Sequence, residues 1–142
     1  MRKTVTITTA AVFLGLSGFA IAQDQDPVKA RQDTMKTIGA QMKVLSDMAK
    51  GTTAFDADAA NAALGTMTEA AETIPVVFET ESIEGETDAS EDIWAYWEDF
   101  VSKAEALHEA AMGAEVTDEA SLSAAMQGVG GACAACHKPY KL

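Results

Sequence analysis

Cys133-Ala134-Ala135-Cys136-His137 is the stretch that decides the fold. Two thiols three positions apart lie on one face of a helix, so both sulfurs can reach the same edge of one porphyrin. The imidazole that follows is available to the iron from the same side, and C-x-x-C-H is the pattern to which a c-type haem is attached. The sequence therefore predicts one covalent haem c per chain, attached to Cys133 and Cys136, with His137 as an axial ligand.

Three other uses of the paired cysteines fit less well. A redox dithiol of the thioredoxin type belongs early in a βαβ pattern, and no strand pattern precedes this motif. A zinc site needs four ligands, and the other soft candidate is His108. A permanent disulfide leaves the histidine after the second cysteine without a role. Haem attachment accounts for all three motif residues.

Outward from the motif, apolar residues recur at steps of three and four and predict four helices. The expected ranges are 26–51 (Asp26-Pro27 to Gly51), 56–75 (Asp56 or Asp58 to Pro75), 88–113 (Asp88 with Glu91 to Gly113) and 117–140 (Thr117-Asp118 to Tyr140). The acidic stretch from 79 to 88 has no apolar period and predicts a loop. The expected fold class is all-α, an antiparallel four-helix bundle with covalently attached haem near the C-terminus and both cysteines at core positions.

Residues 1–22 have the pattern of a secretory signal peptide. Arg2 and Lys3 precede an apolar run from about 10 to 21, and Ala20-Ile21-Ala22 is a cleavage signal. The run is too short to span a bilayer as an anchor. We therefore expect an exported, soluble, periplasmic domain over residues 23–142, with no membrane span in the mature chain.

The charge balance restricts the partners. The chain has 10 basic and 22 acidic side chains, a formal charge of −12. Removal of Arg2 and Lys3 with the leader leaves 8 against 22, a charge of −14. Such a surface repels nucleic acid and anionic membranes, so the expected redox partner proteins have a basic or neutral docking face. No catalytic triad, phosphate loop or paired-carboxylate constellation is present, and the sequence does not predict an enzyme.

The chain resembles the class II cytochromes c, that is, cytochrome c′ and its low-spin relatives, the cytochromes c-556. Besides the haem motif, the resemblance lies in Arg31-Gln32 with Met35, Ile38-Gly39, Ile93-Trp94 and residues 118–122. It implies a left-handed antiparallel bundle, often a homodimer through its first two helices, that transfers electrons or binds small gases in the periplasm. Pro139 departs from the family pattern, and we expect the last helix to end just past His137.

Arg31 falls in phase with the apolar positions of the first helix, where a guanidinium is costly unless it meets an anion. A haem propionate is one such anion; an arginine whose stem packs while its head reaches water is the alternative. The resemblance places Arg31, Gln32 and a residue at or near Asp88 against the haem edge. Asp88 can alternatively cap a helix. Lys141 has two possible roles: a solvated lysine at the chain end, or a charge beside the axial histidine.

Met35 separates two functions. Its thioether, one turn past Arg31, can serve as the sixth iron ligand, which gives a six-coordinate electron carrier. A methionine at such a position is otherwise an ordinary core residue. The iron is then five-coordinate and the protein binds NO or CO.

Overall fold

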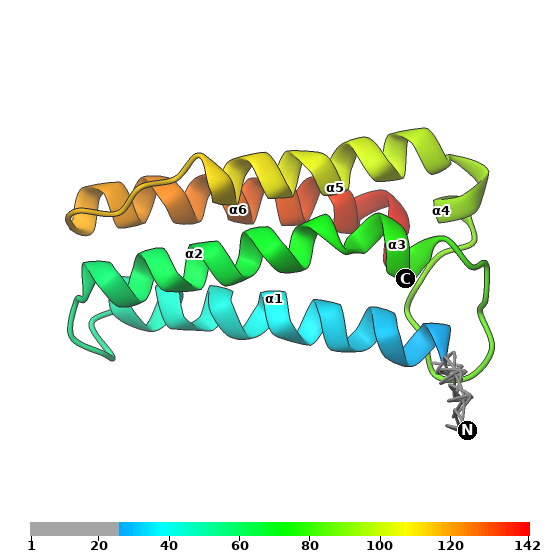
Figure 1. Cartoon of the computed structure of the whole chain (residues 1–142), viewed down its shortest axis with the longest axis horizontal. Coiled ribbons are helices and arrows are strands. Elements are labelled where there is room, and N and C mark those ends of the chain that lie inside the picture. The colour runs from blue at the N-terminus through cyan, green and yellow to red at the C-terminus, as the bar shows by residue number, and fades with distance from the viewer. Residues whose placement is uncertain (1–25) are drawn as a thin grey trace, which may run out of the picture.

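The computed structural model describes residues 26–142, so the signal peptide expected at 1–22 lies outside the described residues. Six helices follow in order: α1 (Pro27–Ala49), α2 (Ala57–Glu72), α3 (Ile74–Phe78), α4 (Asp92–Ala95), α5 (Trp97–Met112) and α6 (Glu119–Tyr140). The four long helices α1, α2, α5 and α6 run alternately up and down, and the short α3 and α4 flank the loop at one end (Figure 1). The expected antiparallel four-helix bundle is confirmed.

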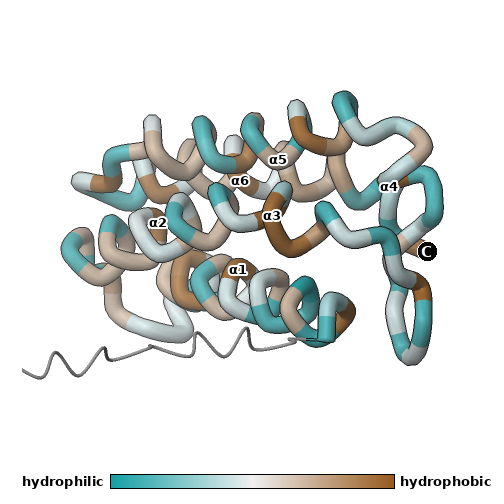
Figure 2. The backbone as a smooth tube through the Cα atoms, turned by 45° about the vertical axis from the view of Figure 1, so that its right-hand side comes forward, coloured by the Kyte–Doolittle hydropathy of each residue, from teal (hydrophilic) through white to brown (hydrophobic). Residues whose placement is uncertain are grey.

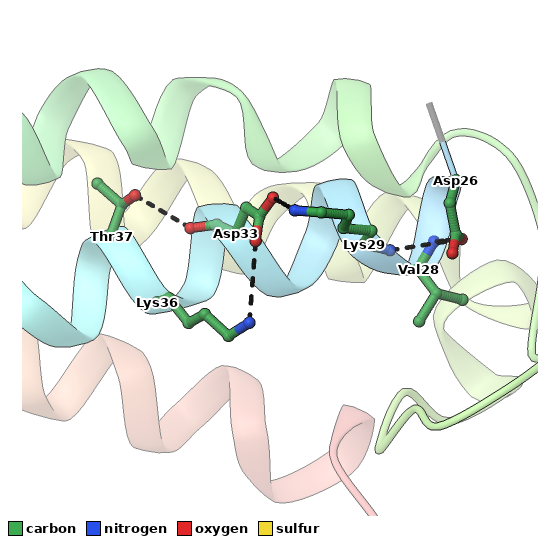
Figure 3. A network of polar contacts seen from close by, with 6 residues as sticks. All are labelled: Asp26, Val28, Lys29, Asp33, Lys36 and Thr37. Atoms are coloured by element: carbon green, nitrogen blue, oxygen red, sulfur yellow. Dashed lines mark hydrogen bonds and ion pairs between the residues drawn. The ribbon is translucent and has the colours of Figure 1, made fainter. Parts of the chain in front are cut away.

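Local signals set most helix ends. The Asp26 carboxylate accepts hydrogen bonds from the Val28 and Lys29 backbone N–H groups at the start of α1 (Figure 3), and Pro27 occupies the first turn. Asp56, rather than Asp58, caps α2. Pro75 sits in the first turn of α3 and separates it from α2, because a proline inside a helix would remove a backbone donor.

The third expected helix is wrong in detail, because the chain breaks at Tyr96 into α4 and α5. Just before the break, the Trp94 indole N–H donates to the Phe78 carbonyl oxygen at 2.8 Å. Asp88 does not cap this segment; the Ser90 hydroxyl accepts the Asp92 N–H instead. Tertiary contacts outweigh the helical period here.

The last helix ends at Tyr140, three residues past His137, as Pro139 led us to expect. A proline disfavours the helical conformation of the residue before it, but Lys138 stays within the helix. Asp118 and Ser121 form a reciprocal capping box at the other end of α6.

The core runs along the bundle axis between the long helices. Its largest fully buried side chains are Leu45, Met67, Ile93, Phe100, Val116, Leu122 and Val129. α1 packs on α2, α2 on α5 and α5 on α6, whereas α1 and α6 contact each other less extensively. Within residues 26–142, no helix combines the length and apolar content needed to cross a lipid bilayer.

Candidate haem-binding site

The two motif cysteines lie on α6 at the margin of the core. Cys133 and Cys136 are half-buried and pack against the core cluster, and His137 is exposed. The sequence placed both sulfurs in the core itself; the structure places them where one side of each still opens to the surroundings. A thiol in that position can be reached by a vinyl group and still contribute to packing.

A pocket of about 670 Å³ opens beside this turn of α6. It is lined by Arg31, Gln32, Met35, Phe78, Gly85, Glu86, Thr87, Asp88, Ala89, Ile93, Phe100, Cys136, His137, Tyr140 and Lys141. Six of the seven site residues expected from the sequence thus meet at one pocket, although they come from three separate parts of the chain. The seventh, Cys133, lies one helical turn before Cys136 and does not line it.

These residues fit a haem. The volume is within the range of sites that enclose a small organic cofactor, roughly 300–1,000 Å³. Phe78, Ile93 and Phe100 give an apolar wall for a porphyrin, while Cys136 and His137 bring a thiol and an imidazole to the same side. A zinc site is not supported, because residues 26–142 contain no group of three or more His, Cys, Asp or Glu side chains placed to hold a metal ion.

Arg31 is buried, with 3% of its surface exposed, so its head does not reach bulk water. Its guanidinium donates to three backbone carbonyl oxygens, those of Val77 at 3.2 Å, Ser82 at 2.7 Å and Thr80. Burial lowers the pKa of Arg31, and the charge of Asp26 partly opposes that shift. Three of the five guanidinium N–H groups are engaged in these bonds, so two stay free for a further acceptor.

Two aromatic rings hold the same guanidinium. Its central carbon lies 5.1 Å from the Phe78 ring centroid and 4.9 Å from the Trp94 ring centroid. A cation over a ring face at this distance is attracted by the ring quadrupole. Arg31 is therefore fixed by its surroundings before any haem propionate is considered.

Gln32 and Asp88 lie at the pocket rim. The Gln32 side-chain amide donates to the Glu86 carbonyl oxygen at 2.7 Å. The Asp88 carboxylate accepts from the Lys141 ammonium at 2.8 Å, and this hydrogen bond lowers the pKa of Asp88. Lys141 is thus neither simply solvated nor free, because it links the end of α6 to the loop before α4.

The surroundings of the motif shift the pKa values of its unmodified side chains. Burial raises the pKa of the Cys133 and Cys136 thiols, with the charge of Lys103 partly opposing the shift at Cys136. Partial desolvation and the nearby Lys141 charge lower the pKa of His137. That favours the neutral imidazole, which is the form that binds iron.

An aromatic cluster behind the pocket was not identified as part of the site from the sequence. Phe100 contacts Phe78, Trp97 and Tyr140, with ring centroids 5.0, 5.6 and 5.4 Å apart. The Tyr140 hydroxyl donates to the Asp99 carboxylate at 2.6 Å. Burial and this bond raise the pKa of Tyr140 to about 12. The apolar phase of Phe100 and Tyr140 indicated burial, but it carried no sign of the pocket.

His108, the other soft ligand considered from the sequence, is half-buried on α5 and does not line the pocket.

A four-helix bundle whose last helix presents C-x-x-C-H to an apolar pocket defines a c-type cytochrome of the helical-bundle class. Comparison with known proteins agrees, since the family model described as Cytochrome C′ matches residues 26–141. The chain belongs to the cytochrome c′ family and is a haem c protein.

Relatives of two kinds match over nearly the whole chain. Cytochrome c-556 of Agrobacterium fabrum is 35% identical and covers 99% of this chain and 97% of its own. Cytochrome c′ of Rhodopseudomonas palustris is 33% identical over the same shares, 99% and 97%. The solved structure of oxidised Rhodopseudomonas palustris cytochrome c556 superposes with a TM-score of 0.75 at 33% identity, covering 83% of this chain and 97% of that one. The family is therefore shown, and relatives named cytochrome c-556 and cytochrome c′ are both represented.

Proposed function

We propose that this cytochrome is a periplasmic electron carrier in which Cys133 and Cys136 form the thioether links to haem, His137 is one axial ligand and Met35 is the other. The observation that carries the proposal is that Met35 lines the same pocket as His137 but comes from α1, which packs against α6. Bound haem supplies one-electron exchange between ferric and ferrous iron. The chain supplies the ligands and the enclosure.

Met35 is the best-placed second ligand among the pocket side chains. The Tyr140 hydroxyl is bonded to Asp99, and the Lys141 ammonium is paired with Asp88. Met35 is half-buried, packs against the core and has no such partner to give up. A thioether opposite imidazole favours ferrous iron and raises the reduction potential, which suits a carrier.

We place the propionate-bearing edge of the haem at the polar end of the pocket, beside Arg31. The two N–H groups of Arg31 that are not bonded to carbonyls can donate hydrogen bonds to a haem propionate at the rim. Gln32 and Asp88 complete that rim, with the Asp88 charge offset by Lys141. Arg31 therefore serves the haem and the backbone at once.

Export and partners follow from the sequence. A leader at residues 1–22 would deliver the chain to the compartment where c-type haem is attached, leaving residues 23–142 as the mature domain. With 22 acidic against 10 basic side chains in the whole chain, the partner protein has a basic or neutral docking face, and nucleic acid is not a partner. A homodimer is the candidate assembly. The role is electron transfer rather than catalysis.

The absorption spectrum of the oxidised protein, recorded for the unmodified chain and for Met35→Ala, tests the axial assignment. We expect a low-spin spectrum that becomes high-spin in Met35→Ala, with a lower reduction potential and new binding of CO to the ferrous protein. Met42→Ala is the matched control, because Met42 also lies half-buried on α1 against the core but does not line the pocket. A high-spin spectrum and free CO binding in the unmodified protein would overturn the assignment.

That outcome would favour the second function, a five-coordinate protein that binds NO or CO. The observation in its favour is that a cytochrome c-556 and a cytochrome c′ both match 99% of this chain, at 35% and 33% identity. The apolar pocket wall formed by Phe78, Ile93 and Phe100 would admit a small neutral gas. The two functions share the haem attachment and differ at Met35.

A further inference from the structure

Residues 79–89, between α3 and α4, form a strap along one side of the haem pocket, and the last five of them line it. Figure 2 shows that this segment is largely hydrophilic. Its one large apolar side chain, Ile83, is 47% exposed and does not hold it to the bundle. Apolar burial therefore contributes little to the position of the strap, apart from the small side chain of Ala89, which packs against the core at its end.

Arg31 holds the first part of the strap. Its hydrogen bonds reach the carbonyl oxygens of Thr80 and Ser82 within the strap, and of Val77 just before it. The guanidinium is a rigid planar fork, so it can bond several carbonyls in fixed directions at once. The flanking rings of Phe78 and Trp94 prevent the fork from rotating away.

The last part of the strap is held by α1 and by the end of α6. Gln32 donates to Glu86, and the Leu142 N–H donates to the Asp88 carbonyl oxygen at 2.8 Å. Ala89 and Lys141 form an antiparallel bridge. The ion pair between Lys141 and Asp88 reinforces this seam.

The strap is thus tied to α1, which carries Met35, and to the turn of α6 that carries His137. Both ties lie beside the pocket that these two residues line. Opening the strap would widen the pocket on the side formed by residues 85–89. Access to the haem therefore depends on bonds that have no part in iron ligation.

We propose that Arg31 is a positioning residue that holds residues 79–89 closed across the haem pocket, so that the strap limits which external ligands reach the iron. The proposal rests on the proposed function only in placing haem in this pocket; it does not depend on Met35 as a ligand. It assigns Arg31 a duty beyond charge pairing with a propionate. A lysine in its place would keep the charge but could not form the three directed bonds.

Cleavage by a Glu-specific protease tests the closure, because the strap contains Glu79, Glu81, Glu84 and Glu86, all exposed. A cut there leaves haem on a C-terminal fragment that haem staining identifies by size. We expect Arg31→Lys to accelerate strap cleavage of the folded holoprotein about tenfold or more, since losing even one charged hydrogen bond shifts a local opening equilibrium by that order. An unchanged cleavage rate would overturn the proposal and leave Arg31 with the propionate role alone.

Ligand discrimination tests the consequence. The rates at which methyl and tert-butyl isocyanide bind the ferrous protein are compared in a Met35→Ala background, so that departure of the thioether does not limit either rate. We expect Arg31→Lys to raise the bulky-to-small rate ratio about tenfold, in step with strap opening. A ratio that stays constant while cleavage accelerates would show that the strap does not control access. A high-spin unmodified protein would instead refute Met35 ligation, and the same comparison would then be run without the Met35 change.

Lys141→Gln provides a second variant in case Arg31→Lys lowers overall stability. It breaks the exposed pair with Asp88 at the other end of the strap and leaves the buried guanidinium in place. We expect cleavage and rate ratio to rise up to about fivefold, as suits an exposed ion pair. Lys138→Gln is the matched control, since Lys138 lies in the same turn and forms no ion pair within residues 26–142. Equal effects of the two changes would overturn the proposed seam.

Discussion

Phe100→Leu tests whether the aromatic cluster behind the pocket supports the haem site. Phe100 is 2% exposed, lines the pocket and contacts three other rings, including that of Tyr140. Leucine keeps most of the apolar surface but none of the ring geometry. The change therefore isolates the aromatic contacts from simple burial.

The expected cost follows from the three ring pairs. Each contributes about 0.5–1.5 kcal/mol beyond its buried area, so the pairs together set a range of about 1.5–4.5 kcal/mol. Contacts that share one ring are not additive, and we expect a loss of about 2 kcal/mol in the free energy of unfolding. A loss of that size changes the ratio of folded to unfolded protein about thirtyfold.

Guanidinium denaturation of the holoprotein, followed by helical circular dichroism, measures this loss. We also expect the haem absorption bands of the folded variant to shift, because Tyr140 lies three residues from His137 on α6 and loses its edge contact with Phe100. Leu45→Ala is the comparison, since Leu45 is fully buried on α1 but does not line the pocket. It should cost about 2–5 kcal/mol with unchanged haem bands. A Phe100→Leu loss below about 0.5 kcal/mol would refute the additional stabilisation attributed to the ring pairs.

Two further changes test the bundle away from the pocket. Asn61→Ala removes an amide that donates to the Val116 carbonyl oxygen at 2.8 Å and accepts the Val116 N–H at 2.9 Å, and two such bonds predict a loss of about 1–3 kcal/mol by denaturant titration. An unchanged midpoint would show that water replaces both bonds. Asp118→Asn keeps a capping oxygen on α6 but removes the charge, and the backbone N–H of Ser121 lowers the pKa of Asp118. Because the pKa of Asp118 is lowered in the folded protein, its charged carboxylate stabilises the fold above the ordinary value of 3.8, and this stabilisation is lost as pH falls through the folded value. In thermal melts, the advantage of the unmodified protein over the variant should therefore shrink below pH 3.8. A difference that stays constant with pH would contradict the contribution of the charge.

Much of the fold could be predicted because local signals set it. Asp26 and Pro27 start α1 where the sequence indicates, and Gly51 follows its end with a φ of +69°, a conformation that suits glycine. The haem motif was equally local, since three residues within five positions define it. Both depend on side chains that are close in sequence.

The break at Tyr96 and the partner of Asp88 could not be predicted in the same way. α4 and α5 share one apolar period, and the break is visible only with the contact between Trp94 and Phe78, 16 residues apart. Asp88 has the spacing of a helix cap, but its carboxylate binds Lys141, 53 residues away. A sequence pattern does not indicate which residue, far along the chain, will contact Trp94 or Asp88 in the fold.

Arg31 shows the limit most sharply. Its phase indicated a buried guanidinium that needs an acceptor, and that much was correct, but the acceptors are main-chain carbonyls 46 to 51 residues away. Every residue has a carbonyl, so no residue type in the strap could reveal the contact. The same fact leaves the strap side chains free to remain acidic and exposed. The backbone carbonyls of the strap therefore hold the pocket closed, while its side chains set the charge at the rim. A Glu→Gln change in the strap can alter partner docking without breaking the hydrogen bonds to Arg31.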